Sequence, residues 1–132
     1  MISGFLLDTD TVSYVLRAQG NAAARMFAEH PSAIFVSSIT VAELDFGLAR
    51  RPSAKLRSRI DAFLKFAQLR PLDLLSAQRF GKVAAHLEKI GKPIGPLDTL
   101  IASQALAHKM TLVSNNTKHF SCVPGLKLEN WL

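Results

Sequence analysis

Three short apolar runs, each ending at a polar residue where a helical pattern begins, constrain the fold of this chain most. They are residues 4–7 before Asp8, residues 33–36 before Ser37, and residues 110–113 before Ser114. Uninterrupted apolar runs of this length are typical of parallel strands, which are buried on both faces. Strands that alternate with helices along the chain predict an α/β domain with a mostly parallel central sheet.

The segments between these runs carry apolar residues at intervals of three and four, as amphipathic helices do. The expected helix caps are Asp10, Asn21, Thr40 and Ser76. Thr40 also forms a capping box with Glu43, three residues further on. Two more short strands are expected at residues 69–72, where Pro71 favours an edge of the sheet, and at residues 126–128.

Length and composition predict one domain, residues 1–132, with a single core, because 48% of the residues are hydrophobic. No apolar run reaches the roughly 18 residues that a membrane-spanning helix needs. Residues 1–4 carry no basic leader, and Cys122 is the only cysteine, which excludes an internal disulfide and a cysteine-based zinc cluster. We therefore expect a cytoplasmic protein that does not act at a membrane.

The net charge of +6 suits a polyanionic partner, because neutralising phosphates releases counterions. Much of the basic charge is concentrated in one segment, which contains Arg50, Arg51, Lys55, Arg57, Arg59 and Lys65. A solvated helix face or a surface for an acidic protein would account for this segment equally well. The charge alone does not choose among these three interpretations.

Three acids and one amide stand where strands end or helices begin: Asp8, Glu43, Asp98 and Asn116. The carboxyl ends of parallel strands share one edge, where carboxylates would repel each other unless a cation joined them. Oxygen ligands select Mg²⁺, for which Mn²⁺ can substitute, and such an ion can activate water for phosphodiester hydrolysis. Structural roles compete with this interpretation, since Asp98 suits the positive end of a helix dipole and Glu43 completes a capping box.

Motifs from one end of the chain to the other resemble one family. They are FLLDT (residues 5–9), SITVAELDFG (38–47), IGPLDTLIA (94–102), LVSNNT (112–117) and VPGLKLENW (123–131). Together, and in this order, they resemble the PIN-domain ribonucleases, especially the VapC-type toxins of bacterial toxin–antitoxin pairs. The resemblance implies a three-layer α/β/α fold and a Mg²⁺-dependent endoribonuclease.

The resemblance also implies a role for each matching residue. Asp8 and Asp98 correspond to the metal ligands, and Glu43 to an acid that positions metal-bound water or acts as a base. Thr9 and Ser38 correspond to supporting polar groups. Asn116 stands in a segment where many relatives carry a fourth acid, so we expect one bound metal ion rather than two.

The partners that the resemblance implies are a cognate antitoxin, a second copy of the chain in a homodimer, and an RNA substrate, often transfer RNA. Arg50 and Arg51 are the basic residues that we expect to meet the RNA backbone or the antitoxin.

Two other functions fit parts of the sequence. In a haloacid-dehalogenase-type phosphatase, Asp8 would be the nucleophile and Asp10 the acid and base, but only Glu129 follows Ser114 to supply the acids that this family needs there. A non-catalytic basic binding module would explain the charge but not the acids. The four histidines show no metal-ligand spacing, so we expect surface or capping roles for them, His119 included.

Overall fold

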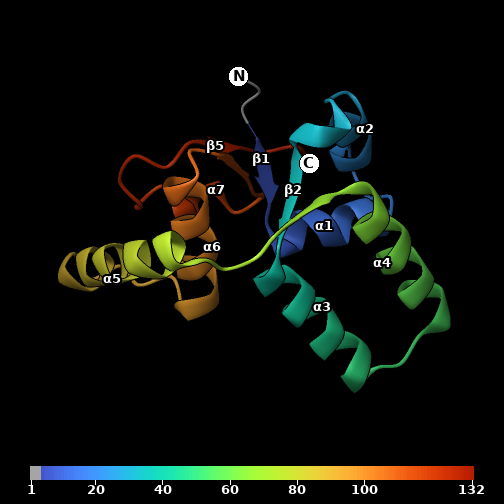
Figure 1. Cartoon of the computed structure of the whole chain (residues 1–132), viewed down its shortest axis with the longest axis horizontal. Coiled ribbons are helices and arrows are strands. Elements are labelled where there is room, and N and C mark those ends of the chain that lie inside the picture. The colour runs from blue at the N-terminus through green and yellow to red at the C-terminus, as the bar shows by residue number, and fades with distance from the viewer. Residues whose placement is uncertain (1–3) are drawn as a thin grey trace.

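The computed structural model describes residues 4–132, and its centre is a parallel sheet of five strands (Figure 1). The strands are β1 (Phe5–Leu7), β2 (Ile34–Ser37), β3 (Gln68–Arg70), β4 (Thr111–Val113) and β5 (Leu128–Glu129). Their spatial order is β3-β2-β1-β4-β5, and every neighbouring pair is parallel. Leu7, the last residue of β1, lies opposite Val36 and Val113, so the carboxyl ends of the three inner strands share one edge.

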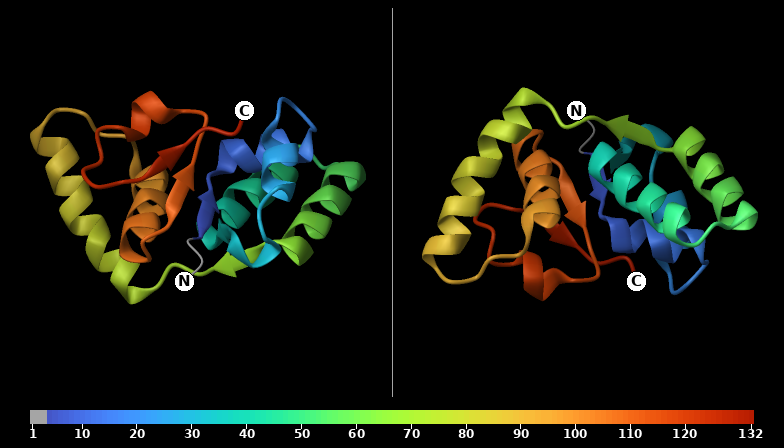
Figure 2. Two further views of the ribbon diagram at one scale, coloured as in Figure 1. Left: turned by 90° about the horizontal axis from the view of Figure 1, so that it is seen from above. Right: turned by 90° about the horizontal axis from the view of Figure 1, so that it is seen from below.

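Seven α-helices connect or follow these strands in the described part of the chain. They are α1 (Thr9–Leu16), α2 (Ala22–Phe27), α3 (Ser38–Arg50), α4 (Ala54–Phe66), α5 (Leu74–Lys89), α6 (Pro96–Ala107) and α7 (Thr117–Phe120), with a 3₁₀ turn at Pro31–Ala33. Helices α1 to α4 cover one face of the sheet and α5 to α7 the other, as Figure 2 shows from above and below. This arrangement confirms the predicted α/β/α layering.

The apolar strand residues separate into two cores, not the single core expected from length and composition, because successive side chains of a strand point to opposite faces. Leu7 and Val113 pack in a core with residues of α1 to α4, whereas Leu6 and Leu112 pack in a second core with residues of α5 to α7. All four are fully buried. Trp131, only 3% exposed, joins the first core, and its ring centroid lies 5.1 Å from that of Phe5.

The predicted helix starts were partly wrong. Helix α3 begins directly after β2, where Ser37 is the cap and its Oγ accepts a hydrogen bond from the Ile39 amide at 3.0 Å. Because α3 starts three residues earlier than expected, Thr40 lies within its first turn, and the capping box of Thr40 with Glu43 does not form.

Two other caps are also shifted toward the N-terminus. Asp73, not Ser76, caps α5, and its Oδ1 accepts a hydrogen bond from the Ser76 amide at 3.0 Å. Asp8, not Asp10, caps α1. In each case the acid that ends the extended segment supplies the cap. Its backbone is extended, and its side-chain oxygen accepts a hydrogen bond from the amide three residues later. The strand expected at residues 69–72 is β3, one residue earlier, and it is an edge strand as predicted.

Helices α3 and α4 form a pair that projects from the sheet, joined by a turn at its far end (Figure 1). None of the helices within residues 4–132 has the length and apolar character to cross a membrane. The prediction about a leader rests on residues 1–4, of which residues 1–3 lie outside the described residues.

Candidate active site

Asp8 is a buried acid at the carboxyl end of the central strand. It follows β1 directly, is only 4% exposed, and its Oδ1 accepts a hydrogen bond from the Thr11 amide at 2.8 Å. Burial raises the pKa of its carboxyl above the usual 3.8, although hydrogen bonds from Ser114 and Thr11 act in the opposite direction. Asp8 therefore both caps α1 and places a carboxylate at the sheet edge.

Asp98 reaches the same part of the molecule from the first turn of α6. Gly95 caps this helix at φ +91°, a conformation that favours glycine, and Pro96 is the first helical residue. Burial raises the pKa of the Asp98 carboxyl, and the neighbouring His119, whose Nε2 lies 3.0 Å from Asp98 Oδ2, lowers it. The backbone at Gly95 thus fixes where a half-buried acid enters the site.

Asp10, in the first turn of α1, acts through its charge on both of these acids. Its negative charge raises the pKa of both the Asp8 and the Asp98 carboxyls, so the three acids share one region. The ion pairs within residues 4–132 include no lysine or arginine bound to Asp8 or Asp98. The region therefore carries negative charge that no lysine or arginine of the described chain pairs. Sequence reasoning considered Asp10 only for the phosphatase alternative.

Glu43 joins the site through a threonine. The Thr9 hydroxyl donates a hydrogen bond to Glu43 Oε1 at 2.7 Å and lies 3.0 Å from the fully buried hydroxyl of Thr40. Glu43 is thereby held at the start of α1, because its partner Thr9 is the first residue of that helix and directly follows Asp8. The structure thus connects Thr9 and Glu43, two predicted site residues, and replaces the expected capping box with a bridge between α1 and α3.

The other predicted site residues lie apart from the acids or make no contact with them. Ser38 Oγ accepts a hydrogen bond from the Leu72 amide at 3.2 Å, which fixes the connection from β3 to α5. Asn116 is exposed at the cap of α7, where its side chain makes no capping hydrogen bond.

Arg50 and Arg51 lie at the C-terminal end of α3. Because α3 has 13 residues, this end is about 20 Å from its start. The Arg50 guanidinium packs 5.4 Å from the centroid of the Phe46 ring.

The arrangement fits a hard divalent cation held by few protein groups. Among residues 4–132, no three His, Cys, Asp or Glu side chains converge closely enough to enclose an ion. Mg²⁺ does not require such a cage, because it usually takes one or two carboxylates and completes its shell with water and substrate phosphate. Asp8 and Asp98, two acids that pair with no lysine or arginine of residues 4–132, have the chemistry of that donor set.

His119 is a site residue that the sequence did not reveal. It lies 21 positions after Asp98, and nothing in that spacing indicates a contact. The short helix α7, anchored by the buried Phe120, turns the imidazole toward Asp98. The contact with Asp98 is one that the expected surface or capping role of His119 did not include.

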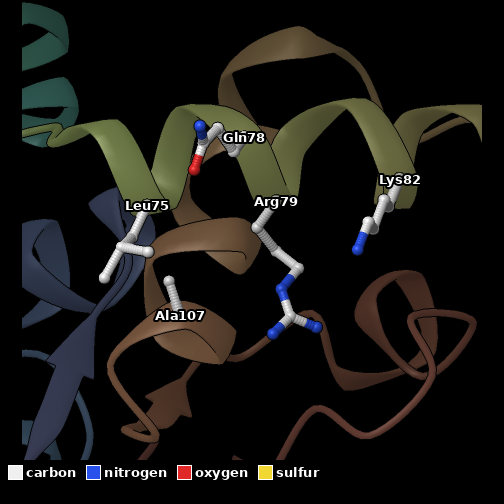
Figure 3. Close-up of a pocket in the computed structure, with 5 residues that line it drawn as sticks. All are labelled: Leu75, Gln78, Arg79, Lys82 and Ala107. Atoms are coloured by element: carbon white, nitrogen blue, oxygen red, sulfur yellow. The ribbon is translucent and has the colours of Figure 1, made fainter.

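A hollow on the outer helical layer lies away from these acids. It has a volume of about 180 Å³ and is lined by Leu75, Gln78, Arg79, Lys82 and Ala107 (Figure 3). Arg79 and Lys82 point from α5 to the same side as Ala107, the last residue of α6. Since Asp98 is in the first turn of α6, the hollow lies toward the opposite end of that helix.

Comparison with known proteins agrees with this geometry. The model of the PIN domain family matches residues 5–126. The chain is 30% identical to "tRNA(fMet)-specific endonuclease VapC" of Salmonella typhimurium, over 96% of this chain and 97% of the relative. It is 35% identical to "Ribonuclease VapC2" of Haemophilus influenzae, over 97% and 98% of the two chains.

Solved structures give the same result. A chain of VapBC2 from Rickettsia felis, solved with a DNA fragment from its promoter, matches with a TM-score of 0.90 and 30% identity over 97% of this chain and 98% of that chain. A chain of DNA-bound VapBC from Salmonella typhimurium matches with a TM-score of 0.88 and 27% identity, over 99% and 100%. With the parallel sheet and its acidic edge, these similarities establish that the chain belongs to the PIN-domain family, in the VapC group of ribonucleases.

Proposed function

We propose that this protein is a metal-dependent endoribonuclease and the toxin of a toxin–antitoxin pair. The observation that carries the proposal is the acidic edge, where neither Asp8 nor Asp98 pairs with a lysine or arginine of residues 4–132, in a chain similar over its whole length to VapC ribonucleases. Membership of the PIN-domain family favours this reaction over the phosphatase alternative, in which Asp8 would itself be phosphorylated.

The chain's own groups have distinct roles in this proposal. Asp8 and Asp98 hold the divalent cation, which we propose to be Mg²⁺ with Mn²⁺ as a substitute; when bound, it supplies charge neutralisation and activation of water. Glu43, held by Thr9, orients the attacking water and accepts its proton. Asn116 is exposed shortly after the end of β4. It takes the place of the fourth acid that many relatives carry, and it orients water or substrate.

The substrate that we propose is RNA, with transfer RNA as the first candidate because the Salmonella relative is named for one. Arg50 and Arg51 lie at the C-terminal end of α3, the opposite end from its start at the sheet edge, and we propose that they bind the RNA backbone. Replacing both with alanine should weaken RNA binding and reduce its dependence on salt, as expected when phosphate contacts are lost.

Cleavage of purified RNA pools tests the proposed activity. We expect Mg²⁺-dependent cuts that EDTA stops, and losses with Asp8→Asn, Glu43→Gln and Asp98→Asn in proteins that remain folded by circular dichroism. Mapping the RNA ends after induction in bacteria would identify the target. Cleavage that continues in EDTA contradicts the metal mechanism, and RNA binding without cleavage by the wild-type protein supports the binding module instead.

We propose that the antitoxin binds an apolar groove between α1, α2 and α4. The groove has a volume of about 370 Å³, and among its lining residues are Val15, Met26, Phe27, Phe63 and Phe66. Phe27 is 65% exposed, and its ring lies 5.3 Å from that of Phe66. An apolar segment of a partner would cover both rings, and the similar solved chains come from complexes of VapB with VapC. Phe27→Asp should weaken antitoxin binding without reducing RNA cleavage.

We also propose a homodimer in the cytoplasm. Leu69, Leu74 and Leu75 are 55%, 70% and 60% exposed on one short stretch from β3 to α5. Three exposed leucines this close in the chain form an apolar surface of the kind that subunit contacts cover. Light scattering of the purified protein should give twice the mass of one chain, and Leu74→Glu should return it to a monomer.

A further inference from the structure

His119 is the one side chain that hydrogen-bonds to the Asp98 carboxylate within the described chain. Its Nε2 lies 3.0 Å from Asp98 Oδ2, and the two side chains are 28% and 38% exposed. Asp98 Oδ1 accepts no hydrogen bond from residues 4–132. One oxygen of the carboxylate is therefore occupied by the protein, and the other is available to a ligand.

The imidazole is itself held in place by the core. Its ring meets that of the next residue, Phe120, edge to face, with the centroids 5.1 Å apart and the planes at 84°. Phe120 is 1% exposed and packs with the residues of α5 and α6. The contact between His119 and Asp98 thus connects the start of α6 to a fixed point of the second core.

An aspartate can rotate its carboxylate about the last side-chain bond, and a ligand has to stop this rotation when it binds. A hydrogen bond to one oxygen removes part of that freedom in advance. Groups that hydrogen-bond to metal-binding carboxylates typically change metal affinity or activity by about 10- to 100-fold when they are removed.

We propose that His119 is a positioning residue for the cation site: its Nε2–H donates to Asp98 Oδ2 and orients the carboxylate so that Oδ1 can bind the metal ion. The proposal rests on the proposed function, which makes Asp98 a metal ligand. A neutral imidazole with its proton on Nε2 is sufficient for this role. His119 itself need not touch the ion or the RNA.

The chain contains a matched control for this contact. His108 Nε2 lies 2.7 Å from Asp73 Oδ2, in a pair with side-chain exposures of 18% and 39%. This second pair joins the C-terminal cap of α6 to the N-terminal cap of α5, at the other end of α6 from Asp98. Both pairs fix α6, but only the His119 pair includes an acid of the proposed site.

Binding of Mn²⁺ to the protein without RNA tests the proposal, because free Mn²⁺ can be counted by electron paramagnetic resonance. We expect His119→Ala to weaken Mn²⁺ binding about 10- to 100-fold, and His108→Ala to leave it within about twofold of wild type. His119→Gln keeps an N–H donor on a side chain of similar reach and should restore most of the affinity. Cleavage by His119→Ala should recover as the Mn²⁺ concentration approaches saturation.

Each other result contradicts a definite part of the proposal. Unchanged Mn²⁺ affinity in His119→Ala, or equal losses in His119→Ala and His108→Ala, would overturn the positioning role and leave the nuclease proposal standing. If His119→Gln binds as weakly as His119→Ala, the N–H donor is not what matters, and the positioning role is also overturned. If the wild-type protein binds no Mn²⁺, the cation site itself fails, and with it the proposed function.

Discussion

Two groups of acidic side chains, one at the carboxyl edge of the sheet and one on the α3–α4 pair, lie in opposite environments. On the α3–α4 pair, Arg57 lies 2.9 Å from Asp45 Oδ1 and 3.6 Å from Asp61 Oδ1, and both carboxylates are more than half exposed. At the sheet edge, Asp8 is 4% exposed and has no basic partner among residues 4–132. The charges of Asp45 and Asp61 are balanced by Arg57 and screened by water. The charge at the sheet edge is not balanced in this way and suits a bound cation.

The difference shows which of the two groups the fold retains at a cost in stability. An exposed ion pair contributes about 0–1 kcal/mol, so evolution can gain or lose it freely. A buried carboxyl with a raised pKa lowers the free energy of unfolding at neutral pH, because the unfolded chain ionises it more easily. Unfavourable charge of this kind is typical of sites where a ligand completes the structure.

The largest effect should come from removing a charge at the sheet edge. Asp98→Asn is expected to reduce RNA cleavage by roughly 10³-fold or more, because in the proposed mechanism it removes a metal ligand and with it several kcal/mol of transition-state stabilisation. The same change removes a half-buried charge, so the free energy of unfolding should stay the same or rise. Cleavage rates and thermal unfolding of the two proteins check both effects. A fall in stability that matches the loss of cleavage would mean that Asp98 serves the fold rather than the reaction.

A smaller loss is expected when Glu43 is released from its position. Thr9→Val keeps the shape of the side chain but removes the hydroxyl that holds Glu43 Oε1 and meets Thr40. We expect cleavage to fall about 10- to 100-fold, as for other groups that orient site residues. Thr9→Ser keeps the hydroxyl and should retain most of the rate. Equal losses in the two variants would show that the methyl group, not the hydrogen bond, supports the site.

The pH dependence of stability should distinguish the two regions directly. The folded pKa of Asp8 is raised, so as the pH rises above 3.8 the unfolded chain loses this proton first and unfolding becomes more favourable. Wild type should therefore lose stability relative to Asp8→Asn as the pH rises from 3 toward neutrality, until the pH passes the folded pKa. Asparagine can keep the cap of α1 through its side-chain oxygen. Urea unfolding of both proteins at several pH values measures the difference, and a constant difference would contradict the raised pKa.

The smallest effect is expected on the α3–α4 pair. Arg57→Ala removes both ion pairs of that region, yet we expect it to change the free energy of unfolding by less than about 1 kcal/mol, because all three side chains are near half exposed or more. Cleavage should not change. Urea unfolding at low and high salt checks this result, since added salt should reduce even the small effect. A loss of several kcal/mol would place Arg57 in a role that its exposure does not explain.

The sequence was sufficient for the features that depend on local pattern. The alternation of apolar strands and helices predicted the sheet and its layers, and the strand ends predicted Asp8 at the edge. The positions that failed depend on where a helix starts: α3 begins three residues earlier than expected, and a bridge from Thr9 to Thr40 and Glu43 takes the place of the expected capping box. Local pattern is a weak guide to such boundaries, because several polar residues near a helix start can each supply the cap.

The contact between His119 and Asp98 was missed for a different reason. The two residues belong to α7 and α6, separated by β4, and the packing of Phe120 decides which way the imidazole points. No local pattern in a single sequence indicates a side-chain contact between residues 21 positions apart. The side-chain roles that the resemblance implied for Ser38 and Asn116 stay predictions, since neither side chain contacts the acids in the described structure.

The central strand β1 pairs with β4, a strand from the opposite part of the sequence. β4 begins at Thr111, and Trp131 closes the core against Phe5, so these contacts join parts of the chain more than 100 residues apart. Contacts of such long range form late and slow the folding of a domain. Asp8 and Asp98, which are 90 residues apart in the sequence, can therefore meet only once these long-range contacts have formed, so the acidic edge is completed late in folding.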